Sequence, residues 1–110
     1  MNDLFSLDSV DDVIHGRLRL GVMAYLLNLG ETDFAQLKAK TAATDGNLSV
    51  QLRKLEEANY VEISKSFVGK KTVTGVKLTE QGRQAFIRYL ENMQRLINEA
   101  SISFDESSAS

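Results

Sequence analysis

The apolar residues of this chain recur first at helical spacing, then at every second position, and then at helical spacing again. Residues 8–30 predict the first helical region, because spacings of three and four place apolar side chains on one face of a helix. Ser9 and Asp12 have the spacing of an N-terminal cap. Gly16 divides a short opening turn from a longer helix, and Gly30 is a natural end. The inward side of this region consists of Leu18, Val22, Met23 and Leu26.

Residues 33–58 predict two helices joined by a short turn, which is the layout of a helix-turn-helix. Asp33 is a favourable N-cap for the first of these helices. The second helix begins after Thr44 and is amphipathic. The inward residues are Phe34, Ala35 and Leu37 in the first helix and Leu48, Leu52 and Leu55 in the second.

Residues 60–78 predict a β-hairpin. Val61 and Ile63 alternate with Glu62 and Ser64, which is the pattern of a half-buried strand. The segment FVGKKT contains a glycine that suits a tight turn, and a second strand follows it. The inward residues of that strand are Val76 and Leu78. A hairpin after a helix-turn-helix is a wing.

Residues 80–104 predict a long final helix, with Thr79 as its N-cap and Glu80 in its first turn. It would be roughly 35 to 40 Å long, whereas the rest of the domain is about 25 Å across. An apolar seam that extends beyond its own domain needs a partner, and a second copy of the chain is the commonest one. We therefore predict a homodimer whose interface is formed by Phe86, Leu90, Met93, Ile97, Ala100 and Phe104.

The expected fold is thus a single domain over residues 1–110, mainly α with a small β-hairpin wing (α+β), and residues 105–110 as a disordered tail. No apolar run approaches the roughly 18 residues of a membrane span. The acidic start also lacks the layout of a signal peptide, so a cytoplasmic protein without a membrane partner is expected.

The composition argues against catalysis and metal binding. The chain has no cysteine and a single histidine, His15, whereas a transition-metal site needs several converging ligands. Glu56 and Glu57 are adjacent and point to different sides of a helix, so they form no acid–base pair. We expect no metal, no cofactor and no enzymatic activity, and we interpret His15 as a partly buried polar residue.

The positive charge is gathered in the middle of the chain. The net charge is −2 overall, but residues 45–83 hold seven Lys or Arg against five Asp or Glu, a net of +2. A local concentration of positive charge matters more for nucleic-acid binding than the total. The distribution of charge therefore favours a nucleic-acid partner, whereas the net charge of the whole chain alone would not favour one.

The front of the helix over residues 45–58 carries the small and polar side chains that a recognition helix needs. Asparagine and glutamine can read adenine with two hydrogen bonds, and Val50 can touch a thymine methyl group. Arg53 and Lys54 lie further along and are expected at phosphates. The remaining predicted DNA contacts are Thr44, Gly46, Asn47, Ser49 and Gln51. The alternative is an ordinary solvated face, but the preceding helix and the basic hairpin favour DNA.

The hairpin tip is basic. Lys65, Lys70 and Lys71 are predicted to contact phosphates or a minor groove, and Lys77 is a further candidate. Lysines on a hairpin also prevent edge-to-edge pairing of strands, and both roles can hold together. Two apolar residues near the tip could either pack under the hairpin or be exposed for contact: Phe67 and Val68.

The chain resembles the small winged-helix transcriptional regulators related to the MarR and ArsR families in TDGNLSVQLRKLEEANYVEISKSFVGKK. It also resembles their first helical region in VDDVIHGRLRLGVMAYL and the start of their last helix in KLTEQGRQAF. The resemblance implies dimers on palindromic operators, with one recognition helix in each major groove. It assigns DNA contacts to Asn47, Ser49, Val50, Gln51 and Arg53, and wing contacts to Lys70 and Lys71.

The sequence departs from this group at Asn59, where a glycine is usual, although asparagine also adopts the left-handed conformation. The chain lacks the cysteines and the additional histidines that metal sensing would need. The lack of cysteine also argues against thiol sensing. We therefore expect a homodimeric regulator that binds double-stranded DNA. The alternative is a winged helix that binds another protein through the same face. A small-molecule effector between the first and last helices stays open, and no residue indicates its class.

Overall fold

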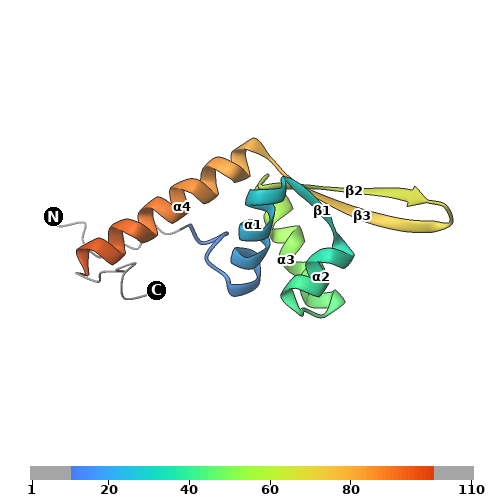
Figure 1. The fold of residues 1–110 in the computed structure, drawn as a ribbon, viewed down its shortest axis with the longest axis horizontal. Coiled ribbons are helices and arrows are strands. Elements are labelled where there is room, and N and C mark those ends of the chain that lie inside the picture. The colour runs from blue at the N-terminus through green and yellow to red at the C-terminus, as the bar shows by residue number, and fades with distance from the viewer. Residues whose placement is uncertain (1–10, 101–110) are drawn as a thin grey trace, which may run out of the picture.

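The computed structural model describes residues 11–100, which form four α-helices and a three-stranded antiparallel sheet. In Figure 1, α1 to α3 pack together in the middle, while the β2–β3 hairpin and α4 extend from them in opposite directions. The elements are α1 (Arg17–Leu29), β1 (Glu31–Asp33), α2 (Phe34–Thr41), α3 (Asp45–Glu57), β2 (Val61–Val68), β3 (Lys71–Leu78) and α4 (Glu80–Glu99). The expected mainly α fold with a hairpin is confirmed.

The core lies where α1, α3 and the start of α4 meet the base of the sheet. Its side chains come from the apolar faces that the periodicity predicts, because each helix has one side that water does not solvate well. The principal buried residues are Val22, Met23 and Leu26 of α1, Leu37 of α2, Leu48, Leu52 and Leu55 of α3, Val61 and Val76 of the hairpin, and Phe86 and Tyr89 of α4. Ala35, expected to face inward, is exposed instead.

Gly16 separates an opening turn from the longer helix, as expected. α1 begins only after Gly16, and the turn before it is capped by Asp11, whose carboxylate accepts from the backbone N–H groups of Val13 (2.8 Å) and Ile14 (3.2 Å). Ser9, the expected cap, lies outside the described residues. Gly30 ends α1 with a φ of +80°, as its position predicts.

The helix-turn-helix has the predicted boundaries. Asp33 caps α2 by accepting from the N–H of Gln36 at 2.8 Å, and Thr44 caps α3 by accepting from the N–H of Asn47 at 3.2 Å. Between the two helices, Ala42 adopts a left-handed conformation with a φ of 57°. This conformation turns the chain sharply, and it costs alanine about 1 kcal/mol because its Cβ is crowded.

The sheet contains one strand that the sequence did not predict. β1 covers three residues and pairs with β3, so that the strand order is β1-β3-β2. A three-residue strand between a helix end and a helix cap has too few residues to show an alternating pattern. β1 ties the helix-turn-helix to the hairpin, since Thr32 pairs with Val76 while Asp33 caps α2.

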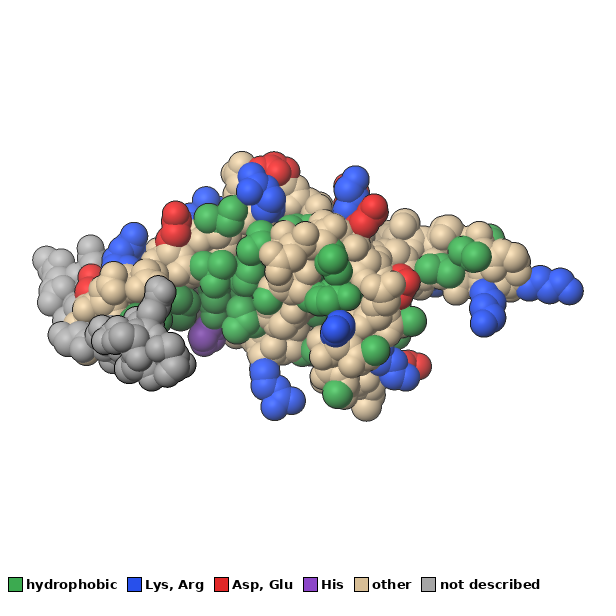
Figure 2. Space-filling view, in the orientation of Figure 1, with side chains coloured by type: hydrophobic (Ala, Val, Ile, Leu, Met, Phe, Trp, Pro, Cys, Tyr) green, Lys and Arg blue, Asp and Glu red, His purple; other side chains and the backbone are tan. Residues whose placement is uncertain are grey.

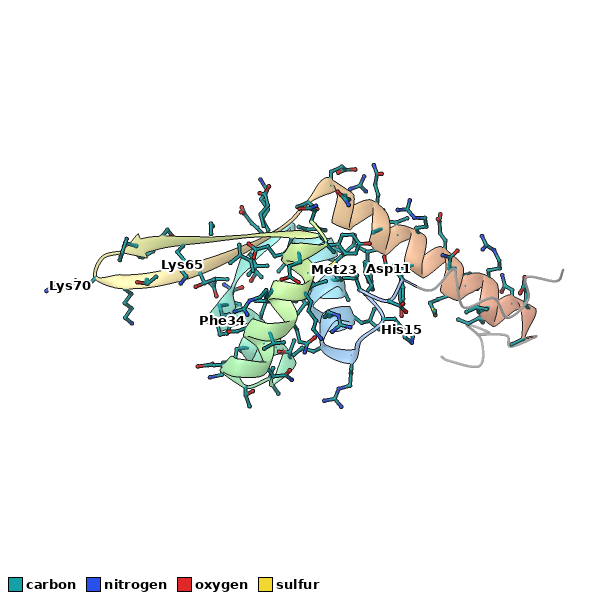
Figure 3. The ribbon with its side chains drawn as sticks, turned by 180° about the vertical axis from the view of Figure 1, so that it is seen from behind. Asp11, His15, Met23, Phe34, Lys65 and Lys70 are labelled. Carbon is teal, nitrogen blue, oxygen red and sulfur yellow. The ribbon has the colours of Figure 1, made fainter. Side chains whose placement is uncertain are left out.

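The hairpin has a two-residue turn. Val68 pairs with Lys71, and Gly69 in the turn has a φ of +65°. A positive φ at the first turn residue is typical of a type II′ turn, which matches the right-handed twist of paired strands. Lys70, the second residue of the turn, is therefore held at the outer end of the hairpin, where Figure 3 labels it.

The start of α4 lies directly against the chain that leaves α3. Asn59 has a left-handed φ of 63°, as expected for the residue that replaces glycine there. The N–H of Thr79 donates to the carbonyl of Tyr60 at 3.1 Å, and the Thr79 hydroxyl donates to the carbonyl of Asn59 at 2.6 Å. A Cβ on Gly82 would come within 2.2 Å of the same Tyr60 carbonyl oxygen. Only glycine allows this close approach.

Candidate nucleic-acid interface

The outer side of α3 is open to solvent along its whole length. Val50 keeps 46% of its surface exposed in the middle of this side, where its side chain is open to an apolar contact. The predicted contact residues Gly46, Asn47, Ser49, Arg53 and Lys54 are also exposed, whereas Gln51 is half-buried. The helix therefore presents a continuous face on which small, polar and basic side chains follow one another.

The N-terminal turn of α3 leaves room for a close approach. A Cβ built on Gly46 would meet no heavy atom within 4 Å. Thr44 is exposed, but its hydroxyl caps the helix, so its first role is structural. Asp45 forms an ion pair with Lys38 of α2 at 2.7 Å. The charge of Lys38 offsets that of the Asp45 carboxylate, which would otherwise repel a DNA phosphate at the start of α3.

One arginine that the sequence analysis did not single out joins α1 to this face. The guanidinium of Arg19 donates to Oε1 of Gln51, and Nε2 of Gln51 donates to Oδ1 of Asn47 at 3.1 Å. The same guanidinium donates to the carbonyl oxygens of Val13 at 2.5 Å and Asp12 at 3.4 Å. Its only sequence signal is a charged residue between two leucines of an apolar helix, which does not identify a partner on α3.

A groove runs between α1, the α2–α3 turn and the front of α3. It has a volume of about 900 Å³, and Asn47 and Gln51 form part of its lining. Its basic lining residues are Arg17, Arg19 and Lys40. The groove thus extends the surface of the recognition helix toward α1 with further positive charge.

The hairpin carries its lysines toward the tip. Lys65, Lys70 and Lys71 are exposed, and Figure 2 shows blue side chains at the end of the hairpin. Lys77 differs, because the strand register places it between Glu31 and Glu62 on the two neighbouring strands. Lys77 therefore lies at the base of the hairpin, beside two carboxylate residues and away from the tip.

The two apolar residues near the tip do not pack under the hairpin. Phe67 keeps 77% of its surface exposed and Val68 keeps 67%. The structure thereby answers a question that the sequence left open. An exposed aromatic ring next to lysines suits contact with a nucleic acid, where apolar side chains can enter a minor groove.

One side of the long helix α4 remains apolar beyond the part of the helix that packs against the rest of the domain. Its 20 residues span about 30 Å. Phe86 was expected at a dimer interface, but it is only 2% exposed and belongs to the core of its own protomer. Met93 packs against that core in part, Leu90 is 43% exposed, and Ile97 is half-buried. Ala100 is the exposed C-cap, and Phe104 lies outside the described residues.

Two tyrosines connect the segment before α1 to the rest of the domain. The hydroxyl of Tyr60 donates to the Asp11 carboxylate at 2.6 Å, and the hydroxyl of Tyr89 lies 2.9 Å from Nδ1 of His15. His15, expected to be partly buried, is exposed. Burial, and then the hydrogen bond to Asp11, raise the pKa of Tyr60 to about 12. Burial also raises the pKa of Tyr89.

These tyrosines predict a loss of stability at alkaline pH. A phenol whose pKa is raised on folding contributes stability that is fully present below its unfolded pKa of about 10 and is lost as the pH rises toward about 12. Tyr60→Phe should therefore be less stable than the unaltered protein at pH 8, because it lacks the bond to Asp11. In urea denaturation the gap between the two proteins should narrow by pH 11, and a constant gap would contradict the role of ionisation.

The described part of the chain also limits other kinds of site. No group of three or more His, Asp or Glu residues within 11–100 could hold a metal ion. No helix among these residues is long and apolar enough to cross a membrane.

An exposed helix preceded by a short helix and followed by a basic hairpin defines a winged helix-turn-helix. The chain belongs to the winged helix DNA-binding domain family, whose model matches residues 18–97. The family assignment confirms the resemblance seen in the sequence, and it makes the chain a DNA-binding domain.

The chain is also similar to other proteins in sequence or in fold. An uncharacterized protein of Methanocaldococcus jannaschii is 37% identical over 84 residues, which cover 76% of this chain and 91% of that protein. The structure of a transcriptional regulator homologue from Pyrococcus horikoshii has a TM-score of 0.83 at 24% identity and covers 92% of this chain and 100% of that one. NadR in complex with 4-hydroxyphenylacetate has a TM-score of 0.62 at 20% identity, over 86% of this chain and 64% of NadR. These two structures share the fold.

Proposed function

We propose that the protein is a sequence-specific transcriptional regulator that binds a palindromic DNA operator as a homodimer. The exposed face of α3 carries this proposal, because its small and polar front is built to come close to base edges. In the proposed complex α3 lies in the major groove, and the hairpin lies along the backbone or in the neighbouring minor groove. The similarity in fold to a transcriptional regulator homologue supports the same reading.

The proposal of a dimer rests on α4. Leu90 and Ile97 lie on the same side of the helix as the buried Phe86, but further along, where the protomer covers them less completely. Their spacing of seven residues matches a seam between two helices. A second copy that packs on this seam would bury it and would place two recognition helices for two half-sites.

Arg53 should contribute affinity through a phosphate. It is exposed on α3 beyond the polar front, where the DNA backbone is expected. Arg53→Ala should weaken operator binding about tenfold for all sequences alike and lower the salt slope by about 2, because the homodimer loses one phosphate contact at each half-site. Fluorescence anisotropy at several salt concentrations measures both. Arg88→Ala removes an equivalent charge from α4 and should leave both unchanged, and an unaltered affinity of Arg53→Ala would remove Arg53 from the interface.

The wing lysines should contribute in the same way. Replacing Lys70 and Lys71 together with alanine should reduce the slope of log affinity against log salt by about 4, since the homodimer loses two phosphate contacts at each half-site and each contact releases counterions. Lys77→Ala is the matched control, because Lys77 lies between Glu31 and Glu62 at the base of the hairpin. Equal slopes for the double variant and the control would show that the wing does not touch DNA.

The second candidate function is protein binding through the same face. The exposed Phe67, Val68 and Val50 favour it, because apolar side chains on a polar surface often mark protein contacts.

We also propose that a small-molecule effector can bind between the first and last helices. NadR is described with 4-hydroxyphenylacetate bound, which shows that a protein of this fold can hold a small molecule.

A further inference from the structure

Three polar side chains form one hydrogen-bonded chain across the junction of α1 and α3. Arg19 donates to Oε1 of Gln51, and Nε2 of Gln51 donates to Oδ1 of Asn47 at 3.1 Å. Gln51 and Asn47 are one helical turn apart on α3, so both amides point to the same part of the surface. Arg19 and Gln51 are half-buried, whereas Asn47 is exposed at the outer end of the chain.

The chemistry of arginine fixes the direction of this chain. A guanidinium has only donors, so the oxygen of the Gln51 amide must face Arg19. Its nitrogen must then face Asn47, and a nitrogen donor there requires the oxygen of the Asn47 amide. What remains for a ligand is the Nδ2 group of Asn47 and the second hydrogen of Gln51 Nε2. The outward groups of both amides are therefore donors.

The position of Arg19 depends on the glycine before α1. A Cβ on Gly16 would lie 2.6 Å from Nη2 and 2.8 Å from Cζ of Arg19. The backbone of Gly16 is extended, with φ −140° and ψ 137°, so alanine could adopt it without strain. The carbonyl oxygens of Asp12 and Val13 hold the guanidinium from its other sides. Because Gly16 has no side chain, the guanidinium of Arg19 has room to lie against α3.

We propose that Arg19 is a positioning residue that sets the base preference of α3. By turning the Gln51 and Asn47 amides, it presents donors to the acceptor pair O6 and N7 of guanine. Adenine needs one donor and one acceptor from the same amide, and the acceptors here are directed toward Arg19 and Gln51. This inference rests on the proposed function, and it replaces the adenine contact expected from the sequence with a guanine contact.

The test is selection of bound sequences from a random duplex pool with the unaltered protein, Arg19→Met and Gly16→Ala. Asn47→Ala and Gln51→Ala identify the base pairs that these residues contact, because each variant should lose its base selectivity at those positions of the duplex. At these positions the unaltered protein should select guanine. Both test variants should shift the relative affinity from guanine toward adenine by about tenfold, since the amides are then free to turn.

Two features of the design separate positioning from charge and from folding. Gly16→Ala keeps the arginine and displaces only the end of its flexible side chain, so neither charge nor the core changes. Arg17→Met removes an equivalent charge from the exposed start of α1 and should lower affinity without changing the base preference. Thermal denaturation of each variant shows that it is folded.

Each remaining outcome overturns the inference. If the unaltered protein selects guanine and both test variants keep that selection, Arg19 does not direct the amides. If Asn47→Ala and Gln51→Ala weaken binding to all sequences equally, the two amides contact phosphate rather than bases. If the unaltered protein selects no sequence at all, both the proposed function and this inference are wrong.

Discussion

Gly82→Ala should lower the free energy of unfolding by about 3 kcal/mol, which is a large part of the stability of a small domain. The added Cβ would lie 2.2 Å from the carbonyl oxygen of Tyr60 and 2.9 Å from its Cα, and both are backbone atoms that cannot rotate away. α4 would have to move off the chain after α3. That movement would also break the hydrogen bonds between Thr79 and Tyr60.

Differential scanning calorimetry checks this prediction, with an expected fall in Tm of roughly 10 to 20 °C. Gly21→Ala is the matched control, because Gly21 also lies in a helix and its Cβ would meet nothing within 4 Å. That control should raise the stability by about 0.5 to 1 kcal/mol through the better helix propensity of alanine. If both variants behaved alike, the close approach at Gly82 would not constrain the domain.

Replacing Leu90 and Ile97 together with glutamate should convert the protein from dimers to monomers. Two carboxylates on the apolar side of α4 cannot be buried against a second copy without losing their hydration. Binding to a two-half-site duplex should fall about 100-fold or more, because the second half-site is no longer bound within the same complex. Light scattering measures the mass, and anisotropy measures binding to one and two half-sites.

The control places glutamate at Gln81 and Gln84, which are exposed on the opposite side of α4. That variant adds the same charge and should remain dimeric. A dimer that persists in the Leu90 and Ile97 variant would show that the seam does not join two copies. A monomer that keeps full affinity for the two-half-site duplex would separate dimer formation from DNA binding.

Features that depend on residues close together in sequence could be predicted. Asp33, Thr44 and Thr79 cap the helices that follow them, because an N-cap bond reaches only two or three residues ahead. The buried leucines of α3 follow from the helical period in the same way. The glycine turn of the hairpin is equally local, and it too is present.

Features that depend on distant partners could not be predicted. β1 exists because β3 provides its hydrogen bonds, and Phe86 is in the core because α4 starts so close to Tyr60. In the candidate interface, the sequence indicates which residues of α3 are exposed. It does not show that Gln51 is bound by an arginine 32 positions earlier, which decides which atoms of its amide face outward.

Selection of bound duplexes from a random pool, followed by anisotropy titrations of the selected sequence at several salt concentrations, tests whether the protein is a sequence-specific regulator. We expect a palindromic sequence with two half-sites and a salt slope of several units, about 0.9 for each phosphate contacted. No enrichment, together with weak binding that is the same for every sequence, would contradict a sequence-specific regulator and would favour a protein partner for the α3 face.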